Sequence, residues 1–229
     1  MIPPNQNSPT TMEPTSNNAS ITILQSSDGV YFRVSNCLLR STSSILDDML
    51  TIPTPAQQPS LDGIPIVHMT EVSTTLEVLL QLIHGDVKSL PVFQTLHHAE
   101  LLLGAIQKYG VVETVRGRAL KLVKEQFLER DPIAVYTVAC RLEWQDLVDA
   151  AAHESLKIDL STINRLDQLP KNLRAEDFQR LRDYHFDFNL SMLLDERMSS
   201  PYEISFQDQI LVRDKYLKAF LKKGITSMA

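Results

Sequence analysis

Residues 21–34 read ITILQSSDGVYFRV, and this stretch decides the fold. Two runs rich in β-branched and aromatic residues alternate along it, which is typical of strands with one buried face. Between the runs stands Asp28-Gly29, a favoured hairpin turn because glycine adopts positive φ at no steric cost. We therefore predict a β-hairpin in which Val30, Phe32 and Val34 share one face.

The residues before this stretch carry little apolar surface. Residues 1–19 are rich in proline, asparagine, serine and threonine, and Glu13 is their only charged residue. Such a composition cannot bury enough apolar surface to offset the entropy lost on ordering. We predict a disordered tail over residues 1–19.

After the hairpin the apolar residues change to helical spacing. Residues 36–50 show this spacing, with Ser41–Ser44 placed to end one short helix and begin the next. Residues 51–63 contain three prolines and a glycine, which predicts a loop. A short strand is expected where apolar residues return, over residues 64–69.

The remainder of the chain is predicted to be helical. Asp131-Pro132 is a favourable helix start, since aspartate caps a helix and proline is tolerated in the first turn. Apolar residues recur at helical spacing in 71–84, 97–109, 113–128, 133–142, 145–157 and 175–185. A terminal amphipathic helix is expected at 210–223, with Tyr216, Leu217, Phe220 and Leu221 on its apolar side. A hairpin and a short strand packed on a helical cluster, with a helical C-terminal extension, make an α+β fold.

Composition indicates a soluble intracellular protein. Its 229 residues carry a net charge of −6, which does not favour binding to nucleic acid or to anionic membranes. Two cysteines without a pattern indicate reduced thiols, and neither a secretion signal nor a run of about 20 apolar residues is visible. We expect a protein of the cytoplasm or nucleus whose partners are other proteins.

The sequence contains no recognisable catalytic, cofactor-binding or metal-binding motif. Its 7 glycines do not form a phosphate loop, and no serine stands in a Gly-x-Ser-x-Gly turn. His97 and His98 are adjacent, so on a helix their side chains diverge rather than share a metal. We therefore expect no enzyme activity and no cofactor. One alternative stays open, an enzyme in which histidines and cysteines converge with a carboxylate in the fold: His68, His84, Cys37 and Cys140.

Six short motifs follow one another in a distinctive order. They are Ile21–Val34, Leu38–Ser41, Asp47–Leu50, Leu79–His84, Leu101–Gly110 and Asp131–Leu142. In this order they resemble the BTB/POZ family, and the expanded fungal members most, over residues 20–185. The resemblance implies a BTB/POZ-like domain at 20–130, a helical extension at 131–185 and a C-terminal tail at 186–229.

Three departures from the family's pattern bear on function. Many members carry aspartate before the first strand and His-Lys after the second, where this chain has Ser20 and Ser35-Asn36. The apolar-x-Glu motif of many cullin-recruiting members is replaced here by Thr51–Thr54. Residues 1–19 show no pattern for the extra helix and strand of the swapped family dimer.

The resemblance implies a protein–protein interaction module without catalysis, acting by self-association or by partner binding. The alternative is a substrate adaptor for a cullin-type ubiquitin ligase. The candidate partner-binding residues are apolar positions on the hairpin and the first helices: Tyr31, Leu46 and Met49. Simple core packing is the alternative interpretation of these three side chains.

Overall fold

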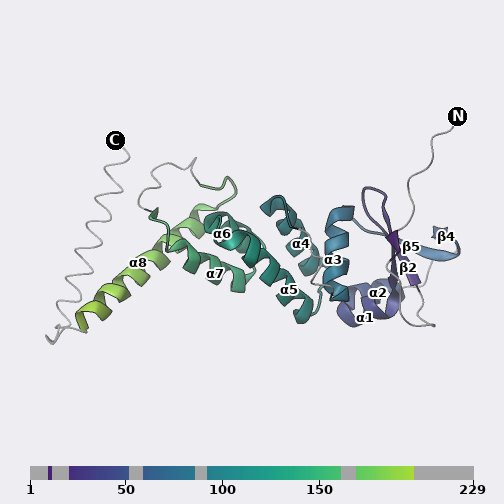
Figure 1. The fold of residues 1–229 in the computed structure, drawn as a ribbon, viewed down its shortest axis with the longest axis horizontal. Helices are drawn as coiled ribbons and strands as arrows, with labels where there is room; N and C mark the ends of the chain where they lie inside the picture. Colours follow the sequence, from purple (N-terminus) through teal and green to yellow (C-terminus); the bar gives the residue numbers. More distant parts are fainter. Residues whose placement is uncertain (1–9, 12–20, 52–58, 86–91, 161–168, 199–229) are drawn as a thin grey trace. The chain divides into compact units, whose positions relative to one another are not determined.

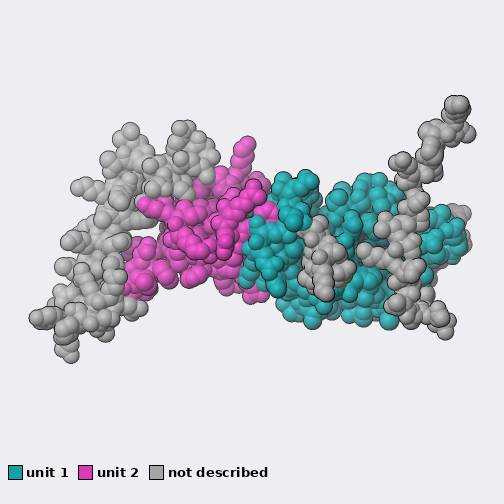
Figure 2. All heavy atoms as spheres, in the orientation of Figure 1, with its two compact units in different colours: residues 1–126 teal, residues 127–229 magenta. Residues whose placement is uncertain are grey.

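The computed structural model describes residues 10–11, 21–51, 59–85, 92–160 and 169–198, with the backbone alone at 10–11 and 193–198 (Figure 1). Within these ranges the fold is α+β, with strands near the N-terminus and helices after them. The chain divides into two compact units, residues 1–126 and 127–229 (Figure 2). The predicted tail at 1–19 lies outside the described residues except at Thr10–Thr11, and the predicted helix at 210–223 lies outside them entirely.

The first unit is built on the predicted hairpin. Strands β2 (Ile21–Gln25) and β3 (Tyr31–Ser35) pair antiparallel, and β5 (Ile64–His68) joins β2 in parallel. Glycine at the turn has φ of +85°, a conformation that L side chains rarely adopt. The predictions of the hairpin and of the following short strand are thus confirmed. Phe32 and Val34 are buried as expected, whereas Val30 lies before β3 and is exposed, so its place on the buried face was predicted wrongly.

The two edges of the sheet differ from the sequence prediction. Strand β4 (Ser60–Leu61) pairs antiparallel with β5 inside the segment expected to be a loop. Strand β1 (Thr10–Thr11) pairs in parallel with β3, inside the segment expected to be disordered. Such short pairings are made by backbone N–H and C=O groups, so they leave no alternating pattern in the sequence. The full strand order is β1-β3-β2-β5-β4.

In the described part of the first unit, five helices follow the hairpin, and their apolar faces close its core. They are α1 (Asn36–Thr42), α2 (Ser44–Thr51), α3 (Ser73–His84), α4 (Leu96–Lys108) and α5 (Glu113–Val123). Helix α3 packs against α4 and α5. The side chains that are at most 1% exposed include Ile23, Leu39, Leu76, Leu79, Leu102 and Leu103. After α5 the chain continues as a π-helix, η1 (Lys124–Leu128), in which the division between the units falls.

A carboxylate in the hairpin turn fixes the start of α3. Asp28 accepts hydrogen bonds from the backbone N–H of Ser73 at 2.8 Å and from its hydroxyl at 2.6 Å. These bonds satisfy a donor that the first turn of a helix leaves without a partner. Hydrogen bonds from the side chains of Ser26 and Ser73 lower the pKa of Asp28 to about 2.

A second carboxylate joins the segment between β5 and α3 to the end of α4. The carboxylate of Glu71 accepts a hydrogen bond from Lys108 Nζ at 2.7 Å and another from the buried hydroxyl of Tyr109. Burial alone raises the pKa of Glu71, but the bonds from Lys108 and Tyr109 outweigh it and bring this pKa below its usual value. Burial, followed by the bond to Glu71, raises the pKa of Tyr109 to about 12.

In the described residues of the second unit, all the regular elements are helices. The unit contains α6 (Pro132–Arg141), α7 (Gln145–Ser155) and α8 (Ala175–Met198). Asp131 caps α6 as predicted, because its Oδ1 accepts from the backbone N–H of Ala134 at 3.1 Å. Helix α8 runs past the predicted end at residue 185, since no glycine or proline interrupts it before Ser199-Ser200-Pro201.

Buried polar contacts tie α8 to α6 and α7. Tyr136 of α6 donates to the backbone carbonyl of Asp177 at 3.1 Å. His185 Nε2 lies 2.8 Å from the hydroxyl of Ser155 at the end of α7. Burial lowers the pKa of His185, against an opposing effect of Asp159. Among the helices in the described ranges, none is both long and apolar enough to cross a bilayer.

Candidate functional site

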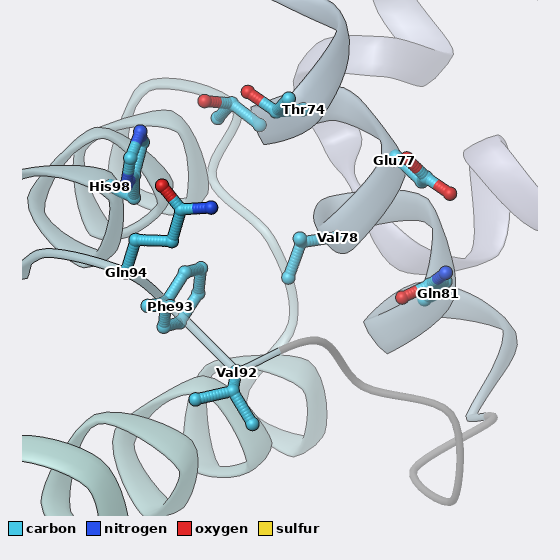
Figure 3. Close-up of a pocket in the computed structure, with 9 residues that line it drawn as sticks. Thr74, Glu77, Val78, Gln81, Val92, Phe93, Gln94 and His98 are labelled. Atoms are coloured by element: carbon cyan, nitrogen blue, oxygen red, sulfur yellow. The ribbon is translucent and has the colours of Figure 1, made fainter.

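A pocket of about 380 Å³ opens beside α3 in the first unit (Figure 3). Its lining comes from α3, from the segment that precedes α4, and from the first turn of α4. The lining residues are Thr74, Thr75, Glu77, Val78, Gln81, Val92, Phe93, Gln94 and His98. We refer to this pocket as the α3 groove.

Helix α3 supplies one wall of the α3 groove. Val78 points from the helix toward the opposite wall (Figure 3) and is buried against it. One turn further on, the side-chain oxygen Oε1 of Gln81 is shielded from solvent and has no hydrogen-bond partner in the described part of the chain. A shielded carbonyl oxygen without a donor costs about 1–3 kcal/mol, so a ligand N–H would be favoured there once the side chain of Gln81 turned this oxygen into the groove.

The segment before α4 supplies the opposite wall. The backbone N–H of Phe93 donates to Oε1 of Gln126 at 2.8 Å, which anchors this segment to the π-helix η1. Phe93 is buried, whereas Val92 beside it is 82% exposed. The anchored backbone thus holds one apolar side chain in the core and presents the next one to solvent.

The first turn of α4 completes the α3 groove. Nδ1 of His98 lies 3.1 Å from the hydroxyl of Thr95, the residue that precedes the helix. Gln94 and His98 lie on the same side of the groove in Figure 3. Amide, hydroxyl and imidazole groups set around apolar side chains are the lining expected of a recognition site, in which apolar contact gives affinity and polar groups give orientation.

The partner-binding residues predicted from the sequence lie elsewhere. Leu46 is 3% exposed and belongs to the core, so it offers almost no surface. Tyr31 on β3 and Met49 on α2 are half-buried, and the hydroxyl of Tyr31 accepts from Nε2 of Gln25 at 3.1 Å. None of these three residues lines the α3 groove.

The α3 groove could not be found from the sequence because its walls come from separate elements. One signal was available in the sequence: Val92-Phe93 is an apolar pair that directly follows a proline inside a predicted loop. Such a pair in a connecting segment is unusual, because loops run over the surface. Its two side chains turn out to have opposite environments.

The residues named for the enzymatic alternative are spread over the fold. Cys37 is exposed on α1 in the first unit, whereas Cys140 is buried in α6 of the second unit. Nδ1 of His84 lies 2.7 Å from the carbonyl oxygen of Leu80 on its own helix. No cluster of three or more histidine, cysteine or acidic residues suited to a metal ion occurs within the described ranges.

The comparisons with known proteins add no relative to this description. No model of a known protein family matches the chain. No curated protein matches it either.

Proposed function

We propose that this chain is a protein–protein interaction module of BTB/POZ-like fold that binds a partner segment in the α3 groove. The observation that carries the proposal is the pairing of an exposed apolar side chain with a shielded, unpartnered acceptor. Val92 is 82% exposed on one wall of the groove, and Oε1 of Gln81 lacks a hydrogen-bond donor on the other. A bound segment would cover the side chain of Val92 and donate a hydrogen bond to Gln81.

The order of elements supports the BTB/POZ-like part of the proposal. The hairpin, two short helices, a short strand and then helices follow one another as the motifs of that family do. Within this proposal residues 20–130 form the domain, and helices α6, α7 and the first part of α8 form its extension. The proposal assigns partner binding to the domain and no catalysis to either part.

The chemistry of the α3 groove indicates what it would accept. An apolar side chain could pack on exposed Val92, where full burial of a valine-sized group contributes about 1.5–3 kcal/mol. A backbone N–H donated to Gln81 would add about 0.5–1.5 kcal/mol. We therefore expect a peptide segment with one apolar anchor, bound with modest affinity.

The first test compares partners retained by the intact chain and by two matched variants. Val92→Glu places a charge on the groove wall, and Val112→Glu places the same charge on a valine that is 38% exposed away from the groove. Affinity purification with mass spectrometry should show partners that Val92→Glu loses and Val112→Glu keeps. Equal recovery by both variants would sink the proposal.

A second variant separates binding from folding. Gln81→Met keeps the length of the side chain and removes the unpartnered oxygen, so the free energy of unfolding should stay unchanged or rise slightly. Binding of a groove-dependent partner should nevertheless weaken by about 3- to 10-fold, measured by calorimetry. Undiminished binding would show that Gln81 does not contact the partner.

Two further measurements define the kind of module. Light scattering of the intact chain reports self-association, because a dimer doubles the mass of 25.9 kDa. Size-exclusion chromatography with a purified cullin scaffold tests the adaptor alternative. Co-elution that Val92→Glu abolishes would assign the adaptor role, and separate elution would exclude it.

A further inference from the structure

Helix α8 carries an exposed apolar stripe in the second unit. Tyr184, Phe188 and Met192 are spaced by four residues, so their side chains lie along one side of the helix. Tyr184 is 39% exposed and Met192 is 49% exposed, while Phe188 is half-buried. We refer to these three residues as the α8 stripe.

The α8 stripe continues the face by which α8 packs onto its neighbours. The buried residues of that face are Asp177, Leu181 and His185. Each of them has a stripe residue seven positions further along, and seven residues complete nearly two turns of an α-helix. The face is therefore buried at these three positions and at least partly exposed at the three stripe positions, the last of which is Met192.

The change from buried to exposed coincides with the end of α7. The hydroxyl of Ser155, the last residue of α7, lies 2.8 Å from His185. The ring of His153 meets Phe188 edge-on at 6.0 Å between centroids. In Figure 1, α8 continues past α7, so α7 ends where the α8 stripe begins.

We propose that residues 210–223 of this chain bind the α8 stripe as an antiparallel helix. The proposal concerns the second unit and does not depend on the α3 groove. It makes 210–223 a further neighbour of α8, besides α6 and α7. The length, register and charge of this segment each support it as the occupant.

The segment is long enough to cover the α8 stripe. As an α-helix its 14 residues would be about 21 Å long. The stripe from Tyr184 to Met192 extends over about 12 Å of helix. The connection at 199–209 begins with Ser199-Ser200-Pro201, which stops α8 and allows the chain to turn back. A connection of this length spans the 8–10 Å between packed helices easily.

The register of such a pair brings apolar residues together. If residue 210 lies opposite residue 198, an antiparallel helix places Tyr216 opposite Met192 and Phe220 opposite Phe188. Aromatic and thioether side chains pack well in contacts of this kind. The segment thus supplies apolar side chains where α8 exposes them.

The charges along the two helices are complementary. Asp183 and Asp187 are exposed on α8 beside the stripe. In the same register Lys222 of the segment lies near Asp187, whereas Asp183 faces residue 225, beyond the segment. Exposed pairs of this kind contribute only about 0.2–1 kcal/mol each, but they favour one orientation of the segment over the other.

Disulfide trapping in the full chain tests the proposal. In a Cys37→Ser background, the pair Met192→Cys with Tyr216→Cys should cross-link within one chain at least 10-fold faster than Asp183→Cys with Tyr216→Cys. Both α8 positions are exposed, so the two pairs differ in register and face rather than in accessibility. Cross-linking between chains would assign the stripe to a second copy, and equal rates would show that it is not covered by this segment; either result overturns the proposal.

Hydrogen exchange gives an independent readout without cysteines. Phe220→Asp should speed exchange of the amides at 184–192 about 10-fold, while Ser227→Asp, which adds the same charge outside the segment, should leave them unchanged. Exchange within α6 and α7 should be the same in both variants, which verifies that the second unit is folded. Unchanged exchange at 184–192 in Phe220→Asp would also overturn the proposal.

Discussion

The polar contacts inside the first unit differ in kind from those inside the second. In the first unit, Asp28 and Glu71 each join segments far apart in the chain, and each is a carboxylate with a lowered pKa. In the second unit, the carboxylate of Asp177 binds Arg174 and Arg180 on its own helix or just before it, and the contact between α7 and α8 uses neutral Ser155 and His185. Acid should therefore affect the two units at different pH.

The direction of each pH effect follows from its pKa shift. Asp28 and Glu71 have pKa values below their usual 3.8 and 4.5, so their contribution to stability is present above those values and is lost as pH falls toward the lowered pKa. His185 has a pKa below its usual 6.5, so the unfolded chain binds its proton first and stability falls as pH drops below 6.5. Mild acid should weaken the second unit before the first.

The largest effect on stability is expected from a substitution in the core of the second unit. Trp144, the only tryptophan of the chain, is 1% exposed in the second unit. Trp144→Ala should lower the free energy of unfolding of that unit by about 3–5 kcal/mol, because it leaves a large cavity. Hydrogen exchange should speed up throughout α6 and α7 and stay slow in β2 and α3. Equal acceleration in both units would show that they unfold as one.

A smaller effect is expected from the loss of the Glu71 carboxylate in the first unit. Glu71→Ala should cost about 2 kcal/mol, because it leaves the buried hydroxyl of Tyr109 without its acceptor. Asp48→Ala, at an exposed carboxylate on α2, should change stability by less than about 0.5 kcal/mol. Urea unfolding of both variants checks the difference. A loss for Asp48→Ala as large as for Glu71→Ala would refute this account of the first unit.

The capping carboxylate should matter less. Asp28→Ala should cost about 1 kcal/mol, the usual value for loss of a helix cap. The matched cap in the second unit is Asp131, and Asp131→Ala should cost about the same because it also loses one capping side chain. Chemical unfolding of the two variants, followed by hydrogen exchange in α3 and α6, measures each loss in its own unit. A much larger loss for Asp28→Ala would mean that the turn contact does more than cap α3.

The smallest effect is the pH dependence of the second unit. His185→Gln keeps a polar group near Ser155 but does not titrate, so it should remove the fall in stability between pH 7 and pH 5. His97→Gln, at an exposed histidine of the first unit, is the control and should leave this fall unchanged. Thermal unfolding at each pH, followed by the fluorescence of Trp144, measures this fall in stability. A fall that survives in His185→Gln would place the titrating group elsewhere.

Local patterns were sufficient to predict most of the elements. The hairpin around Asp28-Gly29, the strand at 64–68 and the helix start at Asp131-Pro132 are each specified by residues next to one another in sequence. The pairing of β4 with β5 was missed, although Asp62-Gly63 is also a turn dipeptide, because the prolines before it favoured a loop. The second half of α8 was missed because its apolar residues occur on more than one side of the helix.

The α3 groove and the carboxylate contacts could not be predicted in the same way. Glu71 and Tyr109 are 38 residues apart, and nothing near either residue specifies the other. The walls of the groove likewise meet only when α3 and the segment before α4 have packed together. Long-range contacts of this kind depend on the tertiary fold, which periodicity along the chain does not encode.

The contact between Asp28 and Ser73 also has a consequence for the order of folding. The carboxylate reaches the start of α3 only after the β2–β3 turn has closed, although the two residues are 45 positions apart. Helix nucleation is costly, and an early partner for its first turn lowers that cost. Closure of the hairpin should therefore promote the nucleation of α3, so that the first strands and the helix that lines the groove form in one cooperative step.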